Sequence, residues 1–102
     1  MPGFELDMAF TVVDLAAGIE RLLDKQGHSW QRSDAEEGSV FRVKMASGHT
    51  VEMTVGPLPA ARATYVSFFP RTLLAAHSAD ASTEEMSALR HAVVMAFLRV
   101  TG

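Results

Sequence analysis

The sequence predicts an α+β fold, a two-layer sandwich in which one antiparallel sheet of four or five strands carries two helices on one face. Three features lead to this prediction: short segments with alternating apolar residues, two longer segments with apolar residues at helical spacing, and hairpin-length connections. Short connections favour antiparallel neighbours, and a helix with one apolar stripe covers one sheet face. The expected order is strand, helix, an optional short strand, three strands and a final helix.

The chain has room for one domain. Its 102 residues fall within the usual size of a unit with a single hydrophobic core. Hydrophobic residues make up 48% of the chain and charged residues 21%, a balance that allows enough apolar burial for folding. We therefore expect residues 1–102 to form a single domain.

The first strand and the first helix are predicted from the N-terminal quarter. Every second residue from Phe4 onward is apolar, which indicates a half-buried strand. Thr11 followed by Asp14 resembles a capping box, and Gly27 is the expected left-handed stop of the helix. The predicted core residues of this helix are Leu15, Ile19, Leu22 and Leu23. A short strand over residues 28–33 follows.

Two alternating runs on either side of Gly48 predict a hairpin. Because the side-chain period of a strand is two, only an odd loop length keeps apolar positions opposite one another. A three-residue loop ending at Gly48 satisfies this and places Arg42 opposite Glu52 on the outer face. A loop shifted by one residue would instead place Lys44 opposite Glu52.

The last strand is expected over residues 63–69, where apolar groups occur on both faces and Pro70 ends the run. Tyr65 and Phe69 share the face that points away from the helices. The following stretch, residues 71–81, is apolar without clear periodicity, and the sequence does not assign it to an element.

The last helix carries more apolar surface than one sheet can cover. Ser82 and Glu85 form a second capping box at its start. Its predicted core stripe is Met86, Leu89, Val93, Phe97 and Val100. Val94, Met95 and Leu98 lie about 80° to 180° around the helix from the start of that stripe. The first helix, the stretch 73–76 or a second copy of the chain could cover them, and we favour a twofold contact between copies.

The charge distribution argues against a nucleic-acid partner. The net charge is −3, and the nine Lys and Arg residues form no run that could follow a phosphate backbone. The predicted order of elements is similar to that of TATA-box-binding-protein-like half domains and double-stranded-RNA-binding domains. The latter meet phosphates with a Lys-rich cluster at the start of their last helix, where this chain has Glu84 and Glu85.

A cytoplasmic location without membrane contact is expected. The N-terminus has neither a cationic leader nor a long apolar stretch, and no apolar run reaches the roughly 18 residues of a membrane span. The chain has no cysteine, which excludes disulfides and thiolate metal sites and is compatible with a reducing compartment.

No metal, cofactor or nucleophilic constellation is predicted. The four histidines are far apart in sequence: His28, His49, His77 and His91. The acidic cluster Asp34, Glu36 and Glu37 is interpreted as a solvated turn, with a hard-cation site as the alternative. The glycines form none of the phosphate-binding loops.

The N-terminus suggests one catalytic alternative. Removal of Met1 would leave Pro2 as a secondary amine, which can act as a base near neutral pH when desolvation lowers its pKa. The opening from Met1 to Phe4 resembles that of the tautomerase family related to macrophage migration inhibitory factor. The resemblance implies Pro2 as the base. In such an enzyme a cation such as Arg42 or Arg71 would hold an acidic substrate. That family continues with a β-α-β repeat, whereas three expected strands separate the helices here.

Together these features predict a non-catalytic binding or protein-interaction module that acts as a homodimer. The expected binding residues are Tyr65, Phe69, Val94, Met95 and Leu98, and the expected ligand is a protein or a small apolar molecule. The alternatives are the tautomerase-like enzyme and a small apolar-ligand carrier with a methionine-lined cavity. The methionines of that cavity would be Met8, Met45, Met53 and Met86.

Overall fold

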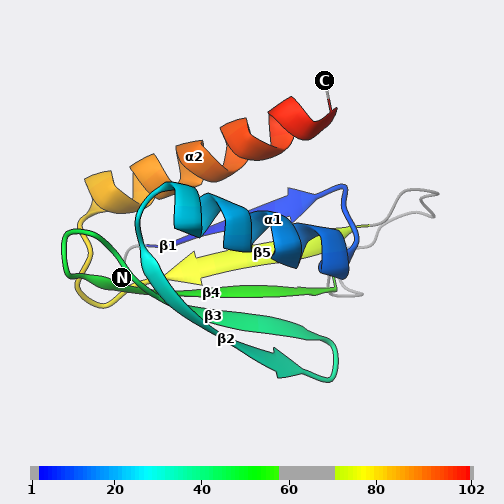
Figure 1. Ribbon diagram of the computed structural model, residues 1–102, viewed down its shortest axis with the longest axis horizontal. Coiled ribbons are helices and arrows are strands. Elements are labelled where there is room, and N and C mark those ends of the chain that lie inside the picture. Colours follow the sequence, from blue (N-terminus) through cyan, green and yellow to red (C-terminus); the bar gives the residue numbers. More distant parts are fainter. Residues whose placement is uncertain (1–2, 58–70, 102) are drawn as a thin grey trace.

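The computed structural model describes residues 3–57 and 71–101, with side chains through residue 97. The described elements are β1 (Gly3–Met8), α1 (Val12–Lys25), β2 (Ser29–Ala35), β3 (Gly38–Lys44), β4 (Thr50–Pro57), β5 (Thr72–His77) and α2 (Thr83–Thr101). The predicted α+β class, with one antiparallel sheet and two helices, is confirmed (Figure 1). In the described part of the chain, no helix has both the length and the apolarity to span a bilayer.

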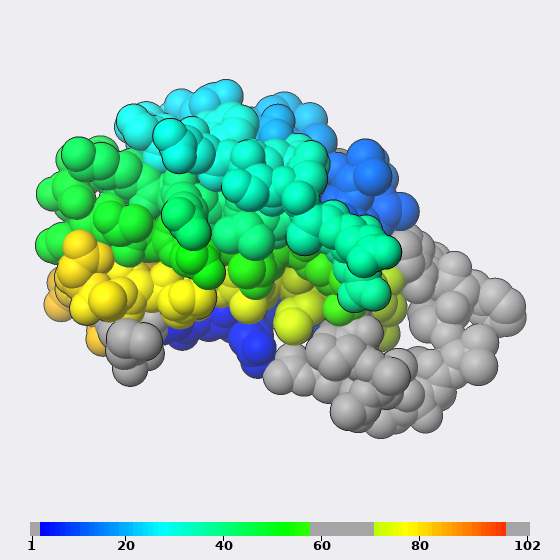
Figure 2. Space-filling view, turned by 90° about the horizontal axis from the view of Figure 1, so that it is seen from below, coloured from blue at the N-terminus to red at the C-terminus, as the bar shows by residue number. Residues whose placement is uncertain are grey.

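The five strands form one open sheet in the order β1-β5-β4-β3-β2, and every neighbouring pair is antiparallel. Strands β2 to β5 are a simple meander, whereas β1 joins the far side of β5. Helix α1 therefore carries the chain from one border of the sheet to the other (Figure 1). Seen from below, the strands follow one another from β2 through β3, β4 and β5 to β1 (Figure 2).

One hydrophobic core joins the sheet to both helices. Alternate residues of β3, β4 and β5 point into it, including Phe41, Met53 and Leu74, which are fully buried. Both helices add the described residues of their predicted apolar stripes to the same cluster, and Val93 of α2 is completely enclosed. The side chain of Val100 lies outside the described residues. The opposite sheet face carries exposed charged residues, among them Glu5 on β1 and Arg42 and Lys44 on β3.

The predicted β3–β4 hairpin is confirmed in register and in turn geometry. Arg42 lies opposite Glu52, and the alternative register with Lys44 opposite Glu52 is not adopted. Gly48 has a φ of +96°, a left-handed conformation that residues with a side chain rarely adopt.

The helix ends follow the capping signals in the sequence. Thr11 accepts a hydrogen bond from the backbone N–H of Asp14 at the start of α1. After α1, Gly27 has a φ of +77°, and His28 N–H bonds to the carbonyl of Leu23, which completes a Schellman motif. At α2, Ser82 and Glu85 exchange backbone-to-side-chain bonds as a capping box.

The stretch that the sequence left unassigned contains β5, an interior strand between β1 and β4. Thr72, Leu74 and Ala76 point into the core, while Leu73 and Ala75 on the outer face are half-buried. Because both faces carry apolar residues, the alternation that marks a half-buried strand is absent. The strand expected over residues 63–69 lies outside the described residues.

Candidate binding groove between the helices

A groove of about 320 Å³ runs between α1 and α2 on the outside of the helical layer. Its lining residues are Gly18, Arg21, Leu22, Lys25, Gln26, Ala92, Met95, Ala96 and Phe97. Its volume lies at the lower end of the range for ligand sites. Met95 on its α2 side is 40% exposed, so the groove is open to solvent along that side.

The groove exists because small residues of the two helices face each other. Gly18 has no side chain, and Ala92 and Ala96 contribute only methyl groups across from it. The Phe97 ring packs over Gly18 so closely that a Cβ there would lie 2.5 Å from its Cζ atom. Phe10 contacts the same ring at a centroid distance of 5.0 Å, which helps to hold it as the floor of the groove.

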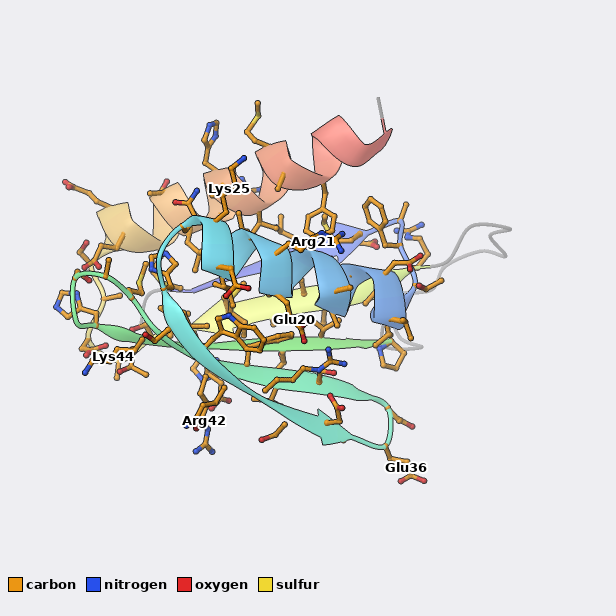
Figure 3. All side chains as sticks on the ribbon, in the orientation of Figure 1. Glu20, Arg21, Lys25, Glu36, Arg42 and Lys44 are labelled. Carbon is orange, nitrogen blue, oxygen red and sulfur yellow. The ribbon has the colours of Figure 1, made fainter. Side chains whose placement is uncertain are left out.

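The charged residues of α1 are sorted onto two sides of the helix. Glu20 and Asp24 lie one turn apart and face β2, where Glu20 pairs with Arg32 at 2.7 Å and Asp24 accepts a bond from Trp30 Nε1 at 2.8 Å. The neighbouring residues Arg21 and Lys25 are also one turn apart but line the groove. Figure 3 shows both cations on the α2 side of α1 and Glu20 on the sheet side.

The basic pair has no acidic counterpart within the described structure. Neither Arg21 nor Lys25 forms an ion pair or hydrogen bond with a described residue, and no described carboxylate lines the groove. This contrasts with Arg32, which contacts two carboxylates, and with Arg71, which pairs with Asp7. The site is therefore an apolar surface flanked by two cations whose charge the described residues leave uncompensated.

A second polar cluster connects the β3–β4 turn to the first turn of α2. Ser47 Oγ donates to Glu85 Oε2 at 2.6 Å, and His49 Nδ1 lies 2.5 Å from Glu85 Oε1. Hydrogen bonds from Ser47, from the backbone N–H of Ser82 and from His49 lower the pKa of Glu85. In a hydrolase triad the serine and the carboxylate contact opposite ring nitrogens of the histidine. Here both are near Nδ1, so the cluster has the geometry of a clamp, not of an activated nucleophile.

This clamp could not be predicted from the sequence, because Glu85 is 38 residues from Ser47 and 36 residues from His49 in the chain. The charge pattern around the groove cations Arg21 and Lys25 is, however, visible in the sequence. Glu20 directly precedes Arg21, and Asp24 directly precedes Lys25. Because the two acids are four residues apart and so are the two bases, this pattern places the acids and the bases on different sides of one helix.

The predicted binding residues are only partly placed by the structure. Met95 lines the groove and is exposed, while Val94 on the same helix is half-buried. The side chain of Leu98, and all of Tyr65 and Phe69, lie outside the described residues. The stretch 73–76, which was one candidate cover for the last helix, is instead part of β5.

The residues of the catalytic and metal alternatives are not brought together in the described structure. Pro2 lies outside the described residues, and Arg71 is paired with Asp7. Asp34 is held by Arg32 and Ser39, so it belongs to a structural network. Among residues 3–57 and 71–97, no group of three potential metal ligands occurs.

The methionines of the carrier alternative are largely core residues. Met45, Met53 and Met86 are buried in the hydrophobic cluster, and Met8 packs against it. Their role in the described structure is to fill the space between the sheet and the helices.

Comparison with known proteins adds no family to this description. No protein-family model matches the chain, and no curated protein matches it.

Proposed function

We propose that this protein is a non-catalytic binding module that holds an apolar group beside an anionic one in the groove between α1 and α2. The observation that carries the proposal is the cation pair Arg21 and Lys25 next to an apolar floor, with no described carboxylate among the residues that line the groove. A cytoplasmic compartment is part of the proposal, since a chain without cysteine needs no oxidising environment.

The apolar part of the groove supports binding because its floor is held in place before a ligand arrives. Phe97 is buried between Gly18 and Phe10, and its position requires no rearrangement of the helices. A preformed apolar surface loses little conformational entropy on binding. The methyl groups of Ala92 and Ala96 leave room for an incoming side chain or ring.

The polar part of the groove supports an anionic ligand. Arg21 and Lys25 project from one side of α1 into a space that only apolar and amide groups otherwise line. A ligand without negative charge would remove water from these cations without forming an ion pair with them, and this desolvation costs free energy. A ligand with an acidic group gains charge-assisted hydrogen bonds at the same position.

An NMR titration with anilinonaphthalenesulfonate, which combines apolar rings with one sulfonate, tests the proposal. We expect the shifted backbone amides to lie in two segments, Gly18–Gln26 and Ala92–Phe97. Ala92→Leu should abolish the shifts because the larger side chain fills the groove. Ala88→Leu is the matched control, since Ala88 is an exposed residue of the same helix that does not line the groove.

Two results would contradict the proposal. One is a set of shifted amides centred on another surface, such as the outer face of β3 and β4. The other is equal binding to the Ala92→Leu and Ala88→Leu variants when both retain the wild-type fold by circular dichroism.

Self-association through α2 is the second candidate, favoured by the exposure of Met95. In a twofold contact, Met95 of each copy would cover the groove of the other. Light scattering at tens of micromolar protein, repeated with Met95→Glu, tests it. A wild-type dimer that Met95→Glu converts to a monomer would establish this interface, and a wild-type monomer would remove it.

A further inference from the structure

Resting on the proposed function, we infer that the occupant of the groove is an amphipathic helix of a partner protein with two acidic residues one turn apart. Arg21 and Lys25 are four residues apart on α1, about 6 Å along its axis. Two carboxylates at positions i and i+4 of another helix have the same spacing. One acidic pair can therefore meet both cations at once.

The shape of the groove fits a helix better than a small ligand. α1 and α2 lie beside each other and run in opposite directions (Figure 1), and small residues lie where they face each other across the groove. A third helix can place a row of side chains into such a crease, as helices do when ridges pack into grooves. A small molecule with one anionic group would satisfy one cation and leave the open Met95 side uncovered.

A second copy of this chain cannot supply the acidic pair from its described helices. In these helices the only acidic pair with i, i+4 spacing is Glu20 and Asp24, and both residues are bonded to β2. A twofold contact across the groove would also bring Arg21 and Lys25 of both copies together, which is repulsive. The charges therefore favour a different, acidic partner.

Three synthetic helical peptides test the inference. They share one row of leucine and alanine residues and differ at two positions, i and i+4, which carry two Glu, two Gln or two Lys. Binding is measured by fluorescence anisotropy at low salt. We expect the Glu peptide to bind about tenfold more tightly than the Gln peptide, as two partly exposed ion pairs would give.

Charge reversal supplies the decisive comparison. The double variant Arg21→Glu with Lys25→Glu should lose the preference for the Glu peptide and prefer the Lys peptide. The control is Arg42→Glu with Lys44→Glu, which makes the same change in charge on the exposed sheet face (Figure 3). This variant should bind the three peptides in the same order of affinity as the wild type.

The outcomes separate this inference from the proposed function. Equal affinity for the Glu and Gln peptides, or no switch to the Lys peptide on charge reversal, would contradict the inference that the groove recognises an acidic pair. If anilinonaphthalenesulfonate maps to the groove but no peptide binds, a helical partner is excluded while a binding groove remains. If neither the dye nor any peptide binds there, both the inference and the proposed function are wrong.

Discussion

At the scale of single residues, the groove depends on the absence of a side chain at position 18. Gly18 is buried on α1, and its backbone is in direct contact with the Phe97 ring. Glycine costs about 1 kcal/mol in a helix interior relative to alanine. The close approach of Phe97 gives a physical reason for a glycine at this position.

Gly18→Ala should therefore have opposite effects in two backgrounds. In the wild type the new Cβ forces the Phe97 ring aside, and we expect the free energy of unfolding to fall by about 1 kcal/mol. Overpacking costs roughly 1 to 3 kcal/mol, and better helix propensity offsets about 1 kcal/mol of it. In a Phe97→Leu background the clash is relieved, so the same substitution should stabilise the protein.

Urea denaturation of the four proteins in this cycle measures the coupling between residues 18 and 97. The same sign of change in both backgrounds would show that the contact with Phe97 does not account for the glycine.

At the scale of secondary structure elements, the exposed border strand β2 is the element with the least cover. Six of its seven residues are exposed, and its outer edge has no partner strand in the described sheet. Such an edge can pair with another chain. Arg32 lies on the helix side of β2, where it bonds to Glu20 and Asp34 and stacks over Phe41 at 5.7 Å. A charged residue directed toward the interior at an edge discourages strand addition.

Replacement of Arg32 tests this role. Arg32→Ala should lower the melting temperature and increase concentration-dependent association, because it uncovers Phe41 and removes the charge at the edge. The melting temperature of Arg32→Lys should lie between those of the wild type and Arg32→Ala, since an ammonium group cannot reproduce the forked contact with two carboxylates. Thermal unfolding and light scattering across a concentration series provide the two readouts.

The matched control is Arg42→Ala on the outer face of β3, where the side chain is mostly exposed and lies 4.0 Å from Glu52. An equal loss of melting temperature in Arg32→Ala and Arg42→Ala would contradict a special role for Arg32.

At the scale of the whole molecule, the clamp of Ser47, His49 and Glu85 fixes the β3–β4 hairpin to the start of α2. Asp80 reinforces it from the preceding loop, where its carboxylate accepts a bond from the backbone N–H of Thr50. The bond from Thr50 is also the main reason why the pKa of Asp80 is lowered. One end of the sheet is thereby connected to one end of the helical layer.

This arrangement predicts an acid-sensitive contribution to stability. The folded-state pKa of Glu85 lies below its ordinary value of 4.5, so its charged form stabilises the fold above that value. The contribution is lost as the pH falls through the lower folded-state pKa. The difference in melting temperature between the wild type and Glu85→Gln should therefore be largest near neutral pH and shrink below about pH 4.

Glu84→Gln is the control for this comparison, because Glu84 is an exposed residue of the same helical turn. Gln at position 85 can still accept the bond from Ser82, so the capping box is preserved and the comparison isolates the charge. A pH-independent difference for Glu85→Gln, or the same pH profile for both variants, would exclude the clamp as the source.

Local signals were sufficient to predict most of the fold. The odd loop length predicted the register of Arg42 against Glu52, and the capping signals at Thr11 and at Ser82 predicted the starts of both helices. The fifth strand escaped prediction because Leu73 and Leu74 place apolar groups on both of its faces.

The candidate site could not be predicted as a unit. It requires Gly18 and Phe97, which are far apart in the chain, to meet when α1 packs beside α2. Periodicity describes each helix alone and contains no information on how two helices are placed relative to each other. Only the sorting of Arg21 and Lys25 to one side of α1 was visible in the sequence.

The pairing of β1 with β5 also affects how the protein is made. Gly3 lies opposite His77, so β1 leaves the ribosome long before its sheet partner has been translated. At about 5 to 20 residues per second, this delay is roughly 4 to 15 s. During that time Phe4 and Leu6 have no neighbouring strand, and the charges of Glu5 and Asp7 keep the nascent segment hydrated until β5 arrives.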